Sequence, residues 1–297
     1  MVGDEFGVRE VLCGLARSTN LQACLAGLWQ QADQLRWFSA SPSRIIIQVG
    51  QAFRPALALD TAASLAAFLA DRIPQCAIEI LDTAARPDEW PGLARREVRA
   101  EDALFVSGVA ATEGLLVPGF WFESFALITV AAAHPDPHTR FAAVLDAQAD
   151  SLRRLPNGHP WQTLVYEAHR LAPSDLVVVC GHARWNDIGS EAWWVVGRED
   201  LRVEQAVATA AGIEVPQLPA LRAMARHEVL PPAPRLTGSL PELKGYLAPQ
   251  WQARVLAARS GADGLRRGVA HDLRMARRNL GKVPHFVRRQ LAARGKG

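Results

Sequence analysis

The sequence has few of the residues that usually build metal clusters, disulfide frameworks or membrane spans. Its 297 residues include four cysteines, and no two of them form a C-x-x-C pair, which excludes the common zinc, dithiol and iron–sulfur spacings. The longest apolar runs fall far short of the roughly 20 residues that a transmembrane helix needs, so we expect none. Around Gly108, Gly114 and Gly119 there is neither G-x-G-x-x-G nor G-x-x-x-x-G-K-[S/T], so the sequence gives little support for a nucleotide-binding loop.

The beginning of the sequence also lacks the pattern of a signal peptide. Its first ten residues, MVGDEFGVRE, carry acidic side chains where a signal peptide has positive charge followed by an apolar run. What is present is 49% apolar residues in a chain long enough to bury a large core. We therefore expect a folded cytoplasmic protein.

Positive charge is concentrated in residues 254–297. This stretch holds 12 lysines and arginines and two acidic residues, which leaves 21 basic and 28 acidic side chains in the other 253 residues. The overall charge of +3 therefore combines an acidic body with a strongly basic tail. In a helix, the apolar residues of this tail would share one side and most of its arginines the other.

Such an amphipathic basic helix has several potential partners. It could lie on an anionic membrane surface at the inner face of the membrane, or bind an acidic protein. It could equally dock on the acidic body of its own chain. Nucleic acid is not expected, because Phe286 is the only aromatic residue in the tail and the sequence fits no known nucleic-acid module.

Strands and helices alternate along the first part of the chain. Residues 6–16 and 20–37 are predicted helices. The β-branched run at 44–49 predicts a strand, followed by a helix at 61–71 and a strand at 76–81. This order indicates a parallel pair of strands joined by a right-handed crossover.

The same alternation continues downstream. Further strands are predicted at 103–107, 125–131, 175–180 and 193–196, and helices at 139–155, 161–170 and 199–211, with another helix opening at Pro216 and Pro219. The proline- and aromatic-rich stretch at 117–123 is a predicted loop and pocket wall. The fold class is therefore α/β, with a mostly parallel sheet covered by helices and a basic helical extension at the C-terminus. The predicted domains are a globular domain at 1–229, a proline-containing connector at 230–253 and the tail at 254–297.

The stretch from Pro173 to Val179, a glycine after this strand, and the helix that closes on Gly212 before Ile213 together resemble the family called domain of unknown function 362. The chain departs from that family at Gln48-Val49-Gly50, where members tend to carry Lys-Pro-Asn, and at Cys180-Gly181, where they tend to carry Asp-Gly. Some relatives also contain a cysteine-rich ferredoxin segment. This chain has none, so an iron–sulfur cluster is not expected.

Cys180, His182 and Asp187 follow the most apolar predicted strand, and they are the candidate catalytic residues. In open α/β sheets, ligands bind beyond the carboxyl ends of the strands. His134 and His138 follow another predicted strand, and together with Cys180 and His182 they could bind a divalent metal ion such as zinc. Alternatively, Cys180 could be a nucleophile beside an imidazole base. The simpler interpretation is a buried thiol beside a surface loop with scattered histidines.

Two functions agree with these observations. The first is an enzyme, or a decayed enzyme, that acts on a small polar metabolite in a bacterial biosynthetic pathway. The second is a non-enzymatic accessory protein that docks through residues 254–297. The identities of the cofactor and the substrate are left open.

Overall fold

A computed structural model gives the fold. It describes residues 11–15, 25, 42–50, 56–81, 93–136, 140–185, 187–214, 218–230, 236–237 and 240–246. The chain divides into two compact units, residues 1–248 and 249–297, and all described residues belong to the first. The predicted tail at 254–297 and nearly all of the predicted helix at 20–37 lie outside the described residues, and the predicted domain boundaries stay predictions.

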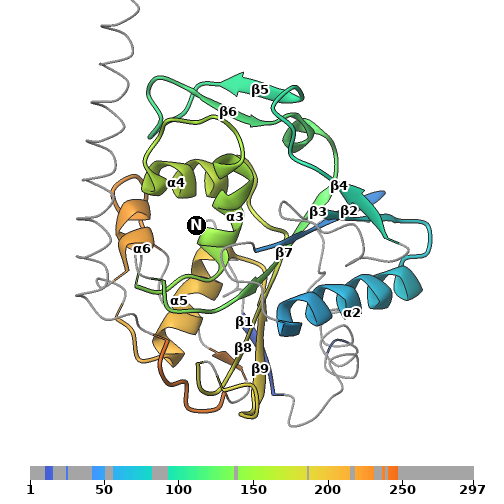
Figure 1. Ribbon diagram of the computed structural model, residues 1–297, viewed down its shortest axis with the longest axis vertical. Coiled ribbons are helices and arrows are strands. Elements are labelled where there is room, and N and C mark those ends of the chain that lie inside the picture. The colour runs from blue at the N-terminus through green and yellow to red at the C-terminus, as the bar shows by residue number, and fades with distance from the viewer. Residues whose placement is uncertain are drawn as a thin grey trace, which may run out of the picture. The chain divides into compact units, whose positions relative to one another are not determined.

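The described residues form ten strands, five α-helices and one 3₁₀ helix (Figure 1). The strands are β1 (Val11–Leu15), β2 (Arg44–Val49), β3 (Ala77–Leu81), β4 (Ala94–Arg96), β5 (Ala103–Val106), β6 (Leu115–Pro118), β7 (Ala126–Ala132), β8 (Leu176–His182), β9 (Ala192–Gly197) and β10 (Leu236–Thr237). The helices are α2 (Ala56–Arg72), η2 (Gly119–Phe122), α3 (Val144–Arg153), α4 (Trp161–Leu171), α5 (Asp200–Ala210) and α6 (Pro219–Met224).

Eight strands form one mixed sheet in the order β10-β1-β9-β8-β7-β2-β3-β4. Strand β9 runs antiparallel to both of its neighbours, β8 and β1, and the other paired strands of this sheet are parallel. Strands β5 and β6 form a separate antiparallel pair. The predicted α/β class with a mostly parallel sheet is confirmed.

The order of the strands places a topological switch point between β2 and β7. From β2 the chain moves outward to β3 and β4, returns to the other side of β2 as β7, and then moves outward again to β8 and β9. Helix α2 packs on one face of the sheet, and α3 and α5 pack on the other (Figure 1). A crevice at the carboxyl ends of the strands is expected where the order reverses in this way, and such crevices commonly bind ligands.

Each face of the sheet has its own hydrophobic core. On β2, Ile45 and Ile47 pack toward α2, and Ile46 packs toward the opposite face. All three isoleucines are fully buried, which explains why this strand is a continuous apolar run. The core between the sheet and α3 also includes Leu243 and Tyr246, from within the predicted connector at 230–253.

Two local predictions need correction. The helix predicted at 6–16 is wrong over Val11–Leu15, which is strand β1 and pairs with β9 and β10. Backbone pairing on both sides outweighs the weak helical pattern of so short a segment. The predicted loop at 117–123 is the end of β6 followed by η2. The strand–helix–strand prediction is confirmed, since β2 and β3 are parallel neighbours.

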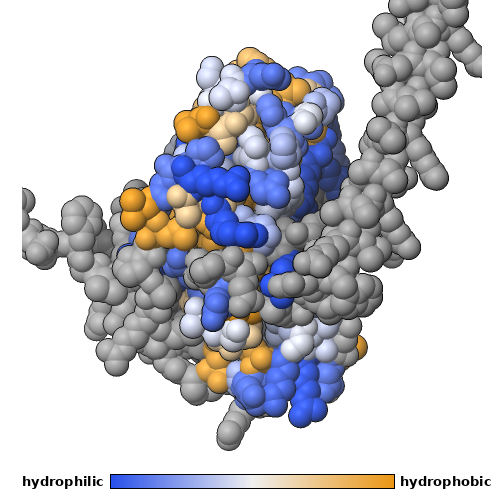
Figure 2. All heavy atoms as spheres, turned by 90° about the vertical axis from the view of Figure 1, so that its left-hand side faces the viewer, coloured by the Kyte–Doolittle hydropathy of each residue, from blue (hydrophilic) through white to orange (hydrophobic). Residues whose placement is uncertain are grey.

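Hydrophilic side chains cover much of one described face of the molecule, with smaller hydrophobic patches between them (Figure 2). Within the described residues, no helix combines the length and the apolar character that crossing a membrane requires.

Candidate functional site

A cavity of about 340 Å³ lies at the carboxyl ends of β7 and β8, next to the switch point, and we call it the switch-point cavity. Its lining is drawn from the first turn of α2, the ends of β7 and β8, the segment after β8, and Tyr246. The residues are Ala56, Leu57, Ala132, Ala133, Gly181, His182, Arg184, Trp185, Asp187, Ile188 and Tyr246. Small apolar side chains and aromatic rings with a few polar groups are typical of a small-molecule site.

His182 is the last residue of β8 and supplies the imidazole ring of this cavity. Its Nδ1 lies 3.1 Å from the carbonyl oxygen of Ser190. A carbonyl oxygen can only accept, so Nδ1 carries the hydrogen, and in the neutral ring the lone pair is on Nε2. A ring in this tautomer can take a proton from a bound molecule, which is the action of a general base.

Arg184 supplies a positive charge to the cavity. Its backbone N–H donates to the Ser190 hydroxyl, at 3.1 Å. Within the described part of the chain, its guanidinium forms no ion pair with a carboxylate. The first turn of α2 also lines the cavity, and the N-terminal end of a helix attracts negative charge. Both features favour a ligand with an anionic group.

Asp187 lines the same cavity, but its carboxylate has a local structural role. Its Oδ1 accepts a hydrogen bond from the backbone N–H of Gly189 at 3.2 Å. Its carbonyl oxygen accepts from the Ser190 hydroxyl at 2.7 Å. These bonds stabilise the turn that follows β8. His182 bonds to Ser190 in the same turn, so the carboxylate of Asp187 helps to position the partner of the histidine.

Cys180 does not line this cavity. Its side chain lies in the core under α2, although β8 continues through Gly181 to His182 and so places Cys180 and His182 on the same face of the sheet. Its side chain is fully buried, and burial raises the pKa of the thiol to about 12, against a smaller lowering effect of a hydrogen bond with Thr61. The thiolate is the nucleophile and the metal ligand. A thiol with this pKa is protonated at neutral pH, so the surroundings of Cys180 are those of a structural core residue.

Of the two histidines predicted as metal ligands after β7, the structure describes only His134. His134 is buried beyond the end of β7, and its Nδ1 lies 3.0 Å from the carbonyl oxygen of Ala132. Its ring centroid is 6.3 Å from that of Trp185, which lines the cavity. His138 lies outside the described residues. Across the described ranges, no three or more His, Cys, Asp or Glu side chains are grouped so that they could hold a metal ion.

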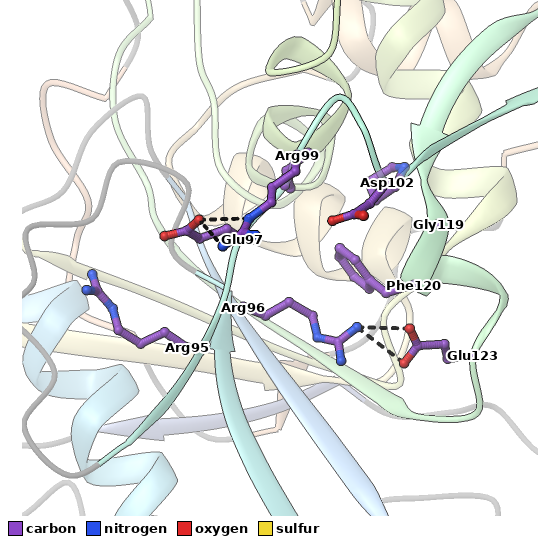
Figure 3. A pocket seen from close by; sticks show the side chains of 10 residues that line it. Arg95, Arg96, Glu97, Arg99, Asp102, Gly119, Phe120 and Glu123 are labelled. Atoms are coloured by element: carbon purple, nitrogen blue, oxygen red, sulfur yellow. Dashed lines mark hydrogen bonds and ion pairs between the residues drawn. The ribbon is translucent and has the colours of Figure 1, made fainter.

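A second and larger cavity, of about 550 Å³, lies between β4, the segment after β4, and η2 (Figure 3). Part of its wall comes from Pro118, Gly119, Phe120 and Glu123, as the stretch at 117–123 predicts. We call it the ion-pair cavity because four of its charged residues, Arg96, Glu97, Arg99 and Glu123, form ion pairs. Arg99 pairs with Glu97 at 3.1 Å.

Arg96 is the centre of this ion-pair cluster (Figure 3). Its Nη1 lies 3.1 Å from Glu123 Oε1 and its Nε lies 2.6 Å from Glu79, while Arg44 also pairs with both carboxylates. The hydrogen bond from Arg96, followed by those from Arg44, lowers the pKa of Glu123. Glu123 is therefore an anion at neutral pH, and a ligand that binds Arg96 or Glu123 would have to break the existing pairs. The switch-point cavity, whose Arg184 forms no ion pair among the described residues, is the better candidate site.

Comparison with known proteins gives no match in sequence and low-scoring matches among solved structures. No protein-family model and no curated protein sequence matches it. The lactate racemase apoprotein from Thermoanaerobacterium thermosaccharolyticum aligns with 67% of this chain and 56% of its own, at 12% identity and a TM-score of 0.43. A Thermotoga maritima protein aligns with 67% of this chain and 61% of its own, at 12% identity and a TM-score of 0.46.

The chain thus spans less than two thirds of the length of either neighbour. The resemblance to the domain of unknown function 362 family stays a prediction, because no family model matches.

Sequence reasoning located the end of β8 but missed three residues that shape the cavity. Arg184 and Trp185 are within five residues of Cys180, and a wider window after the strand would have included them. Tyr246 is 64 residues from His182, in a segment that reads as a connector, and no local pattern pointed to it.

Proposed function

We propose that this protein binds a small organic acid with an apolar body in the switch-point cavity, as an enzyme in which His182 is a general base. The observation that carries the proposal is a mostly apolar cavity, at the carboxyl ends of parallel strands, that holds one imidazole and one arginine with no ion pair in the described part of the chain. Apolar walls favour an apolar body, and the cation of Arg184, which is exposed to solvent, favours an anionic group.

Each part of the lining has a role in this proposal. Leu57, Trp185 and Ile188 contact the apolar body, and Arg184 and the first turn of α2 meet the acid group. His182 Nε2 accepts a proton from the ligand, and the hydrogen bond from Nδ1 to Ser190 keeps the ring in the required tautomer. This differs from a thiol or metal mechanism, since Cys180 stays protonated within the core.

A matched pair of probes tests the site. Phenylacetate and phenylacetamide have nearly the same shape, and only the first is charged at pH 7. We expect phenylacetate to bind the wild-type protein roughly tenfold more tightly than the amide, since a charge-assisted hydrogen bond contributes about 1.5–3 kcal/mol. Titration by NMR, following the ring signals of His182, measures both affinities.

Two variants distinguish the cavities. Arg184→Gln is expected to remove most of the preference for phenylacetate, whereas Arg99→Gln in the ion-pair cavity should leave it unchanged. Equal binding of acid and amide by the wild-type protein, or a loss caused by Arg99→Gln alone, would contradict the proposal.

The charge of residues 254–297 favours a second, independent function, which is docking on an anionic surface. We expect the full chain to co-sediment with vesicles containing phosphatidylglycerol at low salt and to be released at high salt, because each arginine near such a surface contributes about 1 kcal/mol before screening. Phosphatidylcholine vesicles are the control. Binding that persists after deletion of residues 254–297 would exclude this role of the tail.

A further inference from the structure

Residues 243–246, which we call the strap, continue the wall of the switch-point cavity beyond the end of β8. The backbone N–H of Lys244 donates to the carbonyl of Ala183, and that of Trp185 donates to the carbonyl of Lys244, both at 2.9 Å. Arg184 and Lys244 form a parallel bridge. The strap is therefore paired like a short strand with the segment that carries the cavity residues.

Tyr246 attaches the strap to His182 by its side chain. Its hydroxyl accepts a hydrogen bond from the His182 backbone N–H at 3.0 Å and donates one to the His182 carbonyl oxygen at 2.5 Å. The ring is buried, with Trp193 and Trp185 each at a centroid distance of 6.0 Å and in edge-on orientations. One hydroxyl thus bonds to both the backbone N–H and the backbone carbonyl of His182.

The sheet explains why His182 needs this partner. Strand β7 pairs with β8 only as far as Ala132 and Cys180, so β8 extends past its neighbour. On the side of β9, the backbone N–H of the next residue, Ala183, donates to the carbonyl oxygen of Glu191. Polar backbone groups that are shielded from water must be hydrogen-bonded. At His182 the Tyr246 hydroxyl forms the hydrogen bonds that a longer β7 would otherwise form.

Gly181 leaves the room for this arrangement. A Cβ at this position would lie 2.5 Å from the Tyr246 hydroxyl oxygen and 2.5 Å from Cζ2 of Trp193. Any other residue here would displace the tyrosine from the end of β8. A glycine, a tyrosine and a tryptophan from three separate segments therefore fit together around the backbone of His182.

We infer that Tyr246 is the positioning residue of the switch-point cavity, because its hydroxyl fixes the backbone of His182 and so directs the imidazole. The effect of Tyr246 on ligand binding rests on the proposed function above. Its effect on the position of the His182 ring is independent of that function. When the backbone is held, Nδ1 stays within reach of Ser190 and the lone pair stays on Nε2. When it is released, the bond to Ser190 weakens and the ring exchanges between tautomers.

The test uses the two tyrosines of the chain as a matched pair. Tyr246→Phe removes the hydroxyl at the cavity, and Tyr166→Phe removes the hydroxyl of a tyrosine on α4. In the ligand-free full chain, we expect the His182 amide to exchange with solvent roughly tenfold faster in Tyr246→Phe than in the wild type or in Tyr166→Phe. The ¹⁵N shifts of the His182 ring should show the single tautomer in the wild type and a mixture in Tyr246→Phe.

A general loss of stability would accelerate exchange at many amides and leave the ring tautomer of the folded molecules unchanged. An unchanged His182 amide and an unchanged tautomer in folded Tyr246→Phe would overturn the inference. If these two readouts change but phenylacetate binds neither protein, the proposed ligand is wrong and the positioning role stands. If phenylacetate binds the wild type, we expect roughly tenfold weaker binding by Tyr246→Phe and no change in Tyr166→Phe.

Discussion

Replacing Gly181 with alanine is expected to destabilise the protein by roughly 3 kcal/mol or to prevent folding, because overpacking a well-filled core forces rigid groups apart. The new methyl group would lie 2.5 Å from both Trp193 and Tyr246. Neither neighbour can easily move. Trp193 is fully buried, and the Tyr246 hydroxyl is bonded to both backbone groups of His182.

Urea unfolding followed by circular dichroism measures this effect, and Gly158→Ala is the matched control. A Cβ at Gly158 would meet no atom within 4 Å, so this variant should be neutral or slightly more stable. The double variant Gly181→Ala/Tyr246→Phe should recover part of the loss, because phenylalanine lacks the oxygen that the methyl group would meet. If Gly181→Ala is as stable as Gly158→Ala, then Trp193 and Tyr246 do not pack against Gly181 as closely as described here.

Glu204 on α5 is expected to lower the unfolding free energy as the pH rises from about 5 to 8. Burial raises the pKa of Glu204 to about 7, although its carboxylate accepts hydrogen bonds from Leu145 and Val144 at the start of α3. Nearby Asp146 and Asp200 raise it further. The folded state thus holds this proton more tightly than the unfolded chain does.

The direction of the pH effect follows from that difference. Below the unfolded pKa, 4.5, the carboxyl is protonated in both states and the stabilisation is fully present. Between 4.5 and about 7 the unfolded chain loses the proton first, so stability falls, and above about 7 the loss is complete. A shift of this size corresponds to about 3 kcal/mol at most.

Glu204→Gln isolates the contribution of this one group. The amide oxygen can still accept from the α3 backbone but does not titrate, so the variant should gain stability relative to the wild type as the pH rises, by up to about 3 kcal/mol. Urea unfolding at pH 5, 6, 7 and 8 measures the difference. A constant difference between the two proteins across this range would show that Glu204 is ionised throughout.

Glu167→Gln is the matched control, and its pH dependence should have the opposite sign. Glu167 is also fully buried, and its carboxylate likewise accepts hydrogen bonds from backbone N–H groups, those of Ala110 and Ala111. Burial raises its pKa, but the hydrogen bonds from Ala111, Arg170 and Ala110 outweigh this and lower it overall. Its stabilisation is present above the unfolded pKa, 4.5, and is lost as the pH falls below that value, so the difference between Glu167→Gln and the wild type should stay nearly constant from pH 5 to 8 and change only in more acidic solution.

Local sequence patterns were most accurate where a segment is both apolar and continuous. The run at 44–49 coincides with β2, and the predicted strand at 175–180 lies within β8 except for its first residue. Burial on both faces selects β-branched and apolar side chains at every position of such a strand, so the signal is strong. Strand β1 was missed because it is short, and pairing with β9 and β10, both distant in sequence, decides its conformation.

The sequence by itself determined the α/β class, the parallel pair β2–β3, and the position of His182 at the end of a buried strand, because these depend on the periodicity and composition of contiguous residues. Only the tertiary structure decided that Cys180 belongs to the core and that Arg184 has no ion pair among the described residues. It also decided that Tyr246 reaches His182 across 64 positions of the chain. Contacts of this kind are set by how the strands end relative to one another, and no single segment encodes that.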